Sequence, residues 1–96
     1  MILIHFELVG GGTVSLTADK IVGFCDVRLQ QVDPKLPIEE RIATVGGSCF
    51  VIASHGGQFH IAMHRSAAIA SLEGQVESAL RSAQAHNALA LPNNFA

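Results

Sequence analysis

Histidine and cysteine side chains that could do chemistry gather in the second half of the sequence. The stretch "SHGGQFHIAMHRS", residues 54–66, holds His55, His60 and His64, and Cys49 lies just before it. Imidazole and thiolate groups are zinc ligands, and a thiol beside an imidazole can act as a nucleophile. Either chemistry depends on which of these side chains the backbone brings together.

Alternating hydrophobic residues predict a β-hairpin around these histidines. A two-residue turn, centred on His55-Gly56 or on Gly56-Gly57, brings the hydrophobic residues of both strands onto one face. That face would consist of Phe50, Ile52, Phe59, Ile61 and Met63. With Gly56-Gly57 at the centre, Cys49 lies opposite His64 and Ala53 lies opposite His60, so that His60, Ala62 and His64 share the outer face.

This geometry argues against a simple metal site. Four residues along a strand separate His60 from His64 by about 13 Å, whereas each zinc ligand sits about 2 Å from the ion. One ion therefore cannot bind both histidines. The cross-strand pair Cys49 and His64, with a third ligand from a neighbouring protomer, is left as a weak candidate for metal binding.

The same pair is a poor catalytic site. A nucleophilic Cys49 activated by His64 would need an orienting carboxylate and an oxyanion donor, and the sequence implies neither nearby. Ser54 beside His55 fits turn chemistry. We therefore expect a protein that is not an enzyme, with no catalytic residues and no cofactor.

A candidate anion site lies where the hairpin leads into a helix. His64, Arg65 and Ser66 precede a helical pattern, so free backbone N–H groups, the positive end of the helix dipole and a guanidinium would converge there. The alternative is an ordinary helix start, with Ser66 as the N-cap and Arg65 in solvent. A small anionic ligand, such as a nucleotide, is the ligand class this site would take.

The remaining pattern predicts an α+β fold in which five antiparallel strands pack against one C-terminal helix. The predicted strands cover about 2–9, 13–17, 20–31, 43–53 and 58–63. Gly46-Gly47 would form a bulge or bend, and the charged, proline-containing stretch 33–41 a solvated loop. The helix would run from Ser66 to about Leu89. Residues 1–91 would form a single domain, followed by a tail at 92–96.

Two stretches resemble the small FlbD-type flagellar accessory proteins and their phage-encoded look-alikes. They are "TVSLTADKIVGF", residues 13–24, and "GGSCFVIASHGGQFHIAMHRSAAIASL", residues 46–72. The resemblance implies a short first strand, two hairpins and a closing helix, and it contains no catalytic motif. The chain departs from the family in the insertion "QQVDPKLPIEERIA" and in its Ala-rich C-terminal extension. No functional residue is carried over from the family.

Composition narrows the classes of partner. The six Lys and Arg residues form no cluster and the net charge is −2, which disfavours nucleic-acid binding. The first residues, "MILIHFELVGGG", lack the basic start of a signal peptide and are too short an apolar run to span a bilayer. We therefore expect a cytoplasmic protein without a membrane partner, in which Cys25 and Cys49 are free thiols.

The hydrophobic content, 49 %, is high for a chain of 96 residues and favours self-association. A helix from Ser66 to Leu89 would measure about 36 Å, longer than the roughly 20 Å of a six-residue strand. The part beyond the sheet would expose an apolar stripe of Val76, Ala79, Leu80, Ala83, Leu89 and Leu91. We therefore expect a non-enzymatic, homo-oligomeric binding protein that uses this stripe as its interface and that also binds another protein. The alternative is sequestration of a small anionic ligand.

Overall fold

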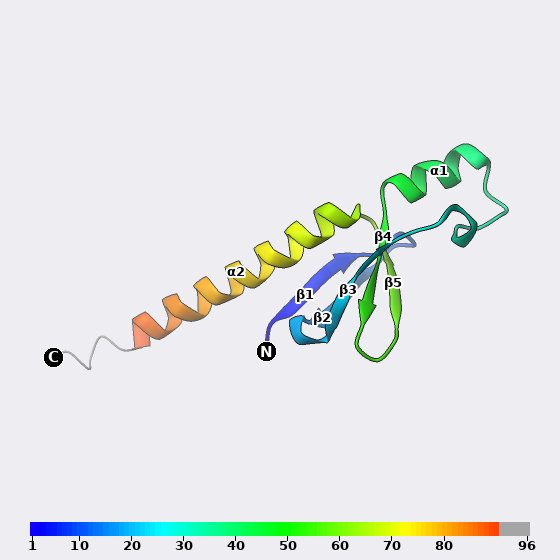
Figure 1. Cartoon of the computed structure of the whole chain (residues 1–96). Coiled ribbons are helices and arrows are strands. Elements are labelled where there is room, and N and C mark those ends of the chain that lie inside the picture. The colour runs from blue at the N-terminus through cyan, green and yellow to red at the C-terminus, as the bar shows by residue number, and fades with distance from the viewer. Residues whose placement is uncertain (91–96) are drawn as a thin grey trace.

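The computed structural model describes residues 1–90, and it has the predicted α+β architecture (Figure 1). Five antiparallel strands form two sheets, and a C-terminal helix packs on them. The elements in order are β1 (Leu3–Glu7), β2 (Thr13–Thr17), the 3-10 turn η1 (Ala18–Lys20), β3 (Ile21–Asp26), the 3-10 turn η2 (Leu29–Gln31), α1 (Ile38–Gly46), β4 (Cys49–Ala53), β5 (Gln58–Ile61) and α2 (Arg65–Ala90).

The first hairpin pairs β1 with β2 as the sequence predicts. Ile4 lies opposite Leu16 and Phe6 opposite Val14. Gly11 and Gly12 both have positive φ angles, +96° and +83°, which glycine adopts without the strain of a Cβ atom. The hairpin therefore directs Ile4 and Phe6 into the core, where both are buried.

The two sheets are joined through β1 and β5. Leu8 and Ile61 form an antiparallel bridge, flanked by hydrogen bonds from Val9 N–H to His60 C=O (2.9 Å) and from Ala62 N–H to Glu7 C=O (2.8 Å). The bridge links the two sheets, so that the strands follow one another in the order β2-β1-β5-β4-β3. The hydrophobic cluster is built from side chains of both sheets and of α2.

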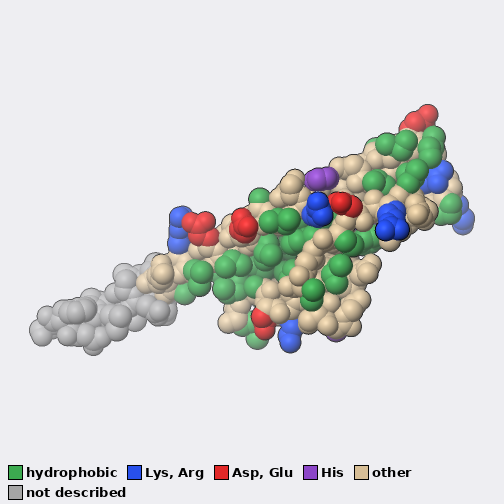
Figure 2. All heavy atoms as spheres, in the orientation of Figure 1, with side chains coloured by type: hydrophobic (Ala, Val, Ile, Leu, Met, Phe, Trp, Pro, Cys, Tyr) green, Lys and Arg blue, Asp and Glu red, His purple; other side chains and the backbone are tan. Residues whose placement is uncertain are grey.

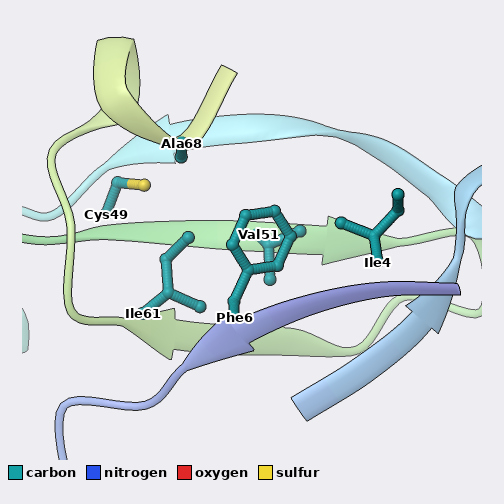
Figure 3. Packing of buried hydrophobic residues seen from close by; sticks show 6 residues of the cluster. All are labelled: Ile4, Phe6, Cys49, Val51, Ile61 and Ala68. Atoms are coloured by element: carbon teal, nitrogen blue, oxygen red, sulfur yellow. The ribbon is translucent and has the colours of Figure 1, made fainter. Parts of the chain in front are cut away.

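The core is closed by the first turns of α2. Figure 3 shows Ala68 of α2 above a group of buried side chains from three strands, which are Ile4, Phe6, Cys49, Val51 and Ile61. Leu72 and Val76, further along α2, are partly buried against the same cluster. The sheet thus supports α2 only as far as about Val76.

The β4–β5 hairpin differs from the prediction in its turn. Ser54, His55 and Gly56 form a three-residue turn, in which Gly56 has a φ of +91° and its N–H donates to the Ala53 C=O (2.9 Å). Cys49 therefore pairs with Ile61, and Phe50 with His60. The predicted pairs Cys49–His64 and Ala53–His60 are wrong.

The new register turns β4 over. Cys49, Val51 and Ala53 face the core, whereas Phe50 and Ile52 lie half-buried on the outer face. β5 keeps its predicted face, since Phe59 and Ile61 pack on the core. A shift of one residue in pairing exchanges the two faces of a strand, which accounts for the whole difference.

Residues 33–46 were also predicted wrongly in part. Residues 38–46 form α1, where a solvated loop and the start of a strand were expected. Pro37 stands at the N-cap, Glu39 and Glu40 occupy the first turn next to the positive end of the helix dipole, and Gly47 is the C-cap. The predicted bulge at Gly46-Gly47 is therefore the end of a helix.

The third strand is shorter than predicted, ending at Asp26, and it carries the sheet's irregularity. The pairing of β3 with β4 shifts between Ile21 and Gly23. After this shift Phe24 pairs with Val51, and Cys25 pairs with Phe50 on the outer face. Ile21, which pairs with the core-facing Ala53, and Cys25 therefore lie on different faces of β3.

Candidate functional site

The three histidines lie in three separate environments. His55 is exposed in the β4–β5 turn, His60 is half-buried on the outer face of β5, and His64 is exposed just before α2. The residues that the structure describes contain no group of three or more His, Cys, Asp or Glu side chains able to hold a metal ion. The register that would have joined Cys49 to His64 does not exist, and Cys49 is in the core.

His60 forms a hydrogen bond that the sequence did not suggest. Its Nε2 lies 2.7 Å from the Ser48 hydroxyl oxygen, and its ring packs against Phe50 at a tilt, with the ring centroids 4.9 Å apart. The same Ser48 hydroxyl donates to the Thr44 C=O at the end of α1. Because a hydroxyl has one proton, His60 must be the donor to Ser48, and burial lowers the pKa of His60.

This Ser–His pair is a structural contact and not a nucleophile with its base. A catalytic histidine accepts the serine proton, whereas here the serine proton points at a helix carbonyl. Among the described side chains, no carboxylate bonds to the other ring nitrogen of His60. The pair ties the end of α1 to the face of β5, and a sequence pattern could not reveal it because Ser48 and His60 belong to elements whose pairing was misassigned.

Cys49 is a core residue. It is fully buried, and burial raises the pKa of its thiol, with smaller contributions from the nearby Cys25 and Asp26. Cys25 and Cys49 form no disulfide, in agreement with the prediction of free thiols, and they lie on opposite faces of the sheet. A buried thiol with a raised pKa does not suit Cys49 to act as a reactive thiolate.

The structure does bring together His64, Arg65 and Ser66 at the start of α2. Ala68 N–H donates to the His64 C=O (2.9 Å), which puts His64 at the N-cap, two residues before the predicted Ser66. The His64 Nδ1 accepts from Ser66 N–H (3.4 Å) and lies 3.1 Å from the Ser66 hydroxyl. Arg65 Nε lies 3.6 Å from a carboxylate oxygen of Asp26.

These partners already satisfy much of what an anion would use. The His64 ring takes one free N–H of the first turn, and Asp26 supplies the negative charge next to Arg65. Asp26 was missed because it lies on β3, forty residues before the helix, and only the sheet brings it there. The anion site stays a prediction from the sequence.

Exposed hydrophobic side chains on α2 form a second candidate for a functional surface. Ile69 and Leu80 on α2 are 41 % and 50 % exposed, and Leu3 and Val22 on the strands are also exposed. Figure 2 shows hydrophobic side chains gathered where α2 overlies the strands, with charged groups scattered around them. Exposed apolar area of this kind is typical of a contact surface.

The predicted interface residues that the structure describes differ in exposure, and Val76 packs partly on the core. Val76 and Ala79 are half-buried, and Leu80 and Ala83 are exposed. The side chain of Leu89 and the whole of Leu91 and of the predicted tail 92–96 lie outside the described residues.

A glutamine fixes the direction of α2 relative to the sheet. The Gln75 amide accepts from His5 N–H (2.9 Å) and donates to His5 C=O (3.0 Å), as a neighbouring strand would do. His5 belongs to β1, on the edge that β2 does not cover. The clamp therefore covers that edge and sets where α2 leaves the sheet.

Comparisons with protein-family models, curated proteins and solved structures find no match to this chain. Within residues 1–90, no helix combines the length and the apolar character needed to cross a membrane.

Proposed function

We propose that this chain is a small non-enzymatic binding protein that acts as a homo-oligomer, with the part of α2 beyond Val76 as its self-contact surface. One observation carries the proposal. α2 continues to Ala90, whereas the last of its residues packed on the core is Val76. The fourteen residues 77–90 therefore extend about 21 Å past their support.

Such an extension is costly for a solitary chain. Isolated helices of about 12–15 residues are marginal in water, and most helical stability in proteins comes from packing an apolar face. The molecule measures 68 × 25 × 20 Å with a radius of gyration of 17.8 Å, whereas a compact chain of this length would have about 12.5 Å. A second helix packed along α2 would supply the missing support.

The experiment is a truncation. A chain ending at Leu80 loses most of the extension but keeps Ala68, Leu72 and Val76. We expect its mass in light scattering to fall below that of the full-length oligomer, while circular dichroism shows that the strands stay folded. A chain ending at Ala90 is the matched control and should keep the full-length mass.

The oligomeric state of the full-length chain decides whether the proposal holds. If it is monomeric at high micromolar concentration, the proposed function is wrong. If the chain ending at Leu80 keeps the oligomeric mass, the oligomer exists but its contact lies elsewhere, and the assignment to α2 is wrong.

A further inference from the structure

One apolar stripe runs along α2 from Val76, the last residue packed on the core, into the unsupported part of the helix. At 100° per residue, Val76, Ala79, Leu80 and Ala83 all fall within about 100° around the helix axis. Ile69, three turns earlier, lies within about 20° of Leu80 on the same side. The stripe therefore runs along α2 from above the sheet to past its end, and Ile69 and Leu80 expose it to solvent.

The stripe of one copy is complementary in shape to the stripe of a second copy whose α2 runs in the opposite direction. In an antiparallel pair of α2 helices crossing near Ala79, Val76 of one copy meets Ala83 of the other, and Leu80 meets Ala79. Each large side chain then faces a small one, which lets the helices approach closely and fill the space between them.

The charged residues beside the stripe also favour an antiparallel pair. Glu77 and Arg81 lie next to Leu80 on one flank, pair with each other within the chain, and are both well exposed. In an antiparallel pair that flank faces its own counterpart, so Glu77 of each copy meets Arg81 of the other. A parallel pair would set this flank against the opposite flank of the partner, where Gln75 and Ser82 carry no charge, and the Glu77–Arg81 attraction between copies would be lost.

We propose that two copies of this chain pair through α2, antiparallel, about a two-fold axis near Ala79, with the two sheets at opposite ends of the shared helical pair. This inference rests on the proposed function and specifies the partner, the direction and the register of the contact. It also requires no residue outside 76–83.

The test uses two charge reversals on the full-length chain. Glu77→Arg gives a flank with two positive charges, and Arg81→Glu gives a flank with two negative charges. Each variant alone should associate about tenfold more weakly at low salt, because attraction becomes repulsion at two symmetric places. An equal mixture of the two should recover wild-type affinity by forming mixed dimers, detectable by native mass spectrometry.

Two controls separate the contact from helix stability. The double variant Glu77→Arg/Arg81→Glu keeps both the internal and the intermolecular pairs and should associate like the wild type. Glu39→Arg makes the same charge change on α1, far from the stripe, and should have no effect. Circular dichroism reports whether either single variant unwinds α2.

The outcomes distinguish the inference from the proposed function. If the wild type is monomeric, both are wrong. If the wild type is oligomeric but the single variants associate equally well, or their mixture fails to recover affinity, the antiparallel pairing is wrong while the homo-oligomer stands.

Discussion

α1 and α2 are two helices of the same chain, and they differ in how firmly the rest of the structure holds them. α2 buries Ala68 completely, packs Leu72 and Val76 on the core, and is clamped to β1 through Gln75. α1 buries none of its residues, and it exposes Ile38 and Ile42 by 47 % and 57 %. Figure 1 shows α1 at the end of the molecule opposite to the free end of α2.

The difference shows that sheet contact, and not apolar spacing alone, decides how firmly a helix is held. Ile38, Ile42 and Val45 on α1 have helical spacing, yet the main neighbour of this helix is the short turn η2. Its end is tied by the Ser48 hydroxyl to β5. We therefore expect α1 to open locally, and the start of α2 to open only when the whole domain unfolds.

The largest effect should come from charging the contact between α2 and the sheet. Ala68→Asp places a carboxylate at a fully buried position, at a cost of about 3 kcal/mol or more. Urea denaturation should show an unfolded or barely stable protein. Ala67→Asp, at the exposed neighbouring position, is the control and should change stability little. Equal effects for both would mean that α2 is not anchored there.

A smaller loss should follow from removing the clamp. Gln75→Leu leaves the N–H and C=O of His5 without their partners, which should destabilise the domain by about 1–3 kcal/mol. Hydrogen exchange at the His5 amide should accelerate together with the stability loss in urea. Gln84→Leu, at an exposed position on the same helix, tests whether a leucine on α2 has any effect by itself. An unchanged His5 exchange rate in Gln75→Leu would contradict the clamp.

The same substitution in each helix gives the sharpest form of the comparison. Ala70 on α2 and Ala43 on α1 are both exposed, and Ala→Gly in a helix interior costs about 1 kcal/mol. Ala70→Gly should lower the free energy of global unfolding by about that amount. Ala43→Gly should leave it nearly unchanged and raise hydrogen exchange only within α1. If both variants lower global stability equally, α1 unfolds together with the sheet and the contrast is wrong.

The smallest effect concerns pH and the tie between α1 and β5. Burial lowers the pKa of His60 below its ordinary value of 6.5, so the unfolded chain binds a proton more readily than the folded one. The corresponding stability is present above about pH 6.5 and is lost as the pH falls below it. Urea midpoints of the wild type should therefore fall more steeply between pH 7 and pH 5 than those of His60→Gln. Parallel curves would show that His60 titrates alike in both states.

The sequence predicted the structure correctly where its hydrophobic pattern was compatible with only one secondary structure and one buried face. In β1, Ile4 and Phe6 alternate with the polar His5 and Glu7, so the buried face was unambiguous. The change of period after Ser66 likewise predicted α2 to within one residue of its start. The α+β class followed from these two regions.

The sequence was ambiguous where every residue could be buried. The β4 stretch "CFVIA" is apolar at each position, so alternation could not choose its inner face. The inner face of β4 was therefore set by the length of the β4–β5 turn. With Gly56 in the left-handed conformation, this turn has three residues and not the predicted two. The argument against a metal shared by His60 and His64 assumed an extended strand through both residues, whereas β5 ends at Ile61.

The helix α1 was hidden by its composition. Pro34, Pro37 and the charged residues around them are typical of a loop, and the apolar positions that follow were taken as the start of a strand. Pro37 in fact precedes a helix, where its missing N–H costs nothing. The Ser48–His60 and Arg65–Asp26 contacts depended on these assignments and on tertiary structure, so no local pattern could have predicted them.

The clamp between Gln75 and His5 has a consequence for how the chain refolds. The β1–β2 hairpin contains only local contacts and can form within microseconds, but the partners that cover its other edge are distant, with Gln75 seventy positions from His5. Until β5 and α2 arrive, β1 presents open N–H and C=O groups that another chain can bind as an added strand. The yield of refolding should therefore fall as protein concentration rises, even though the folded domain is small and its edge is covered.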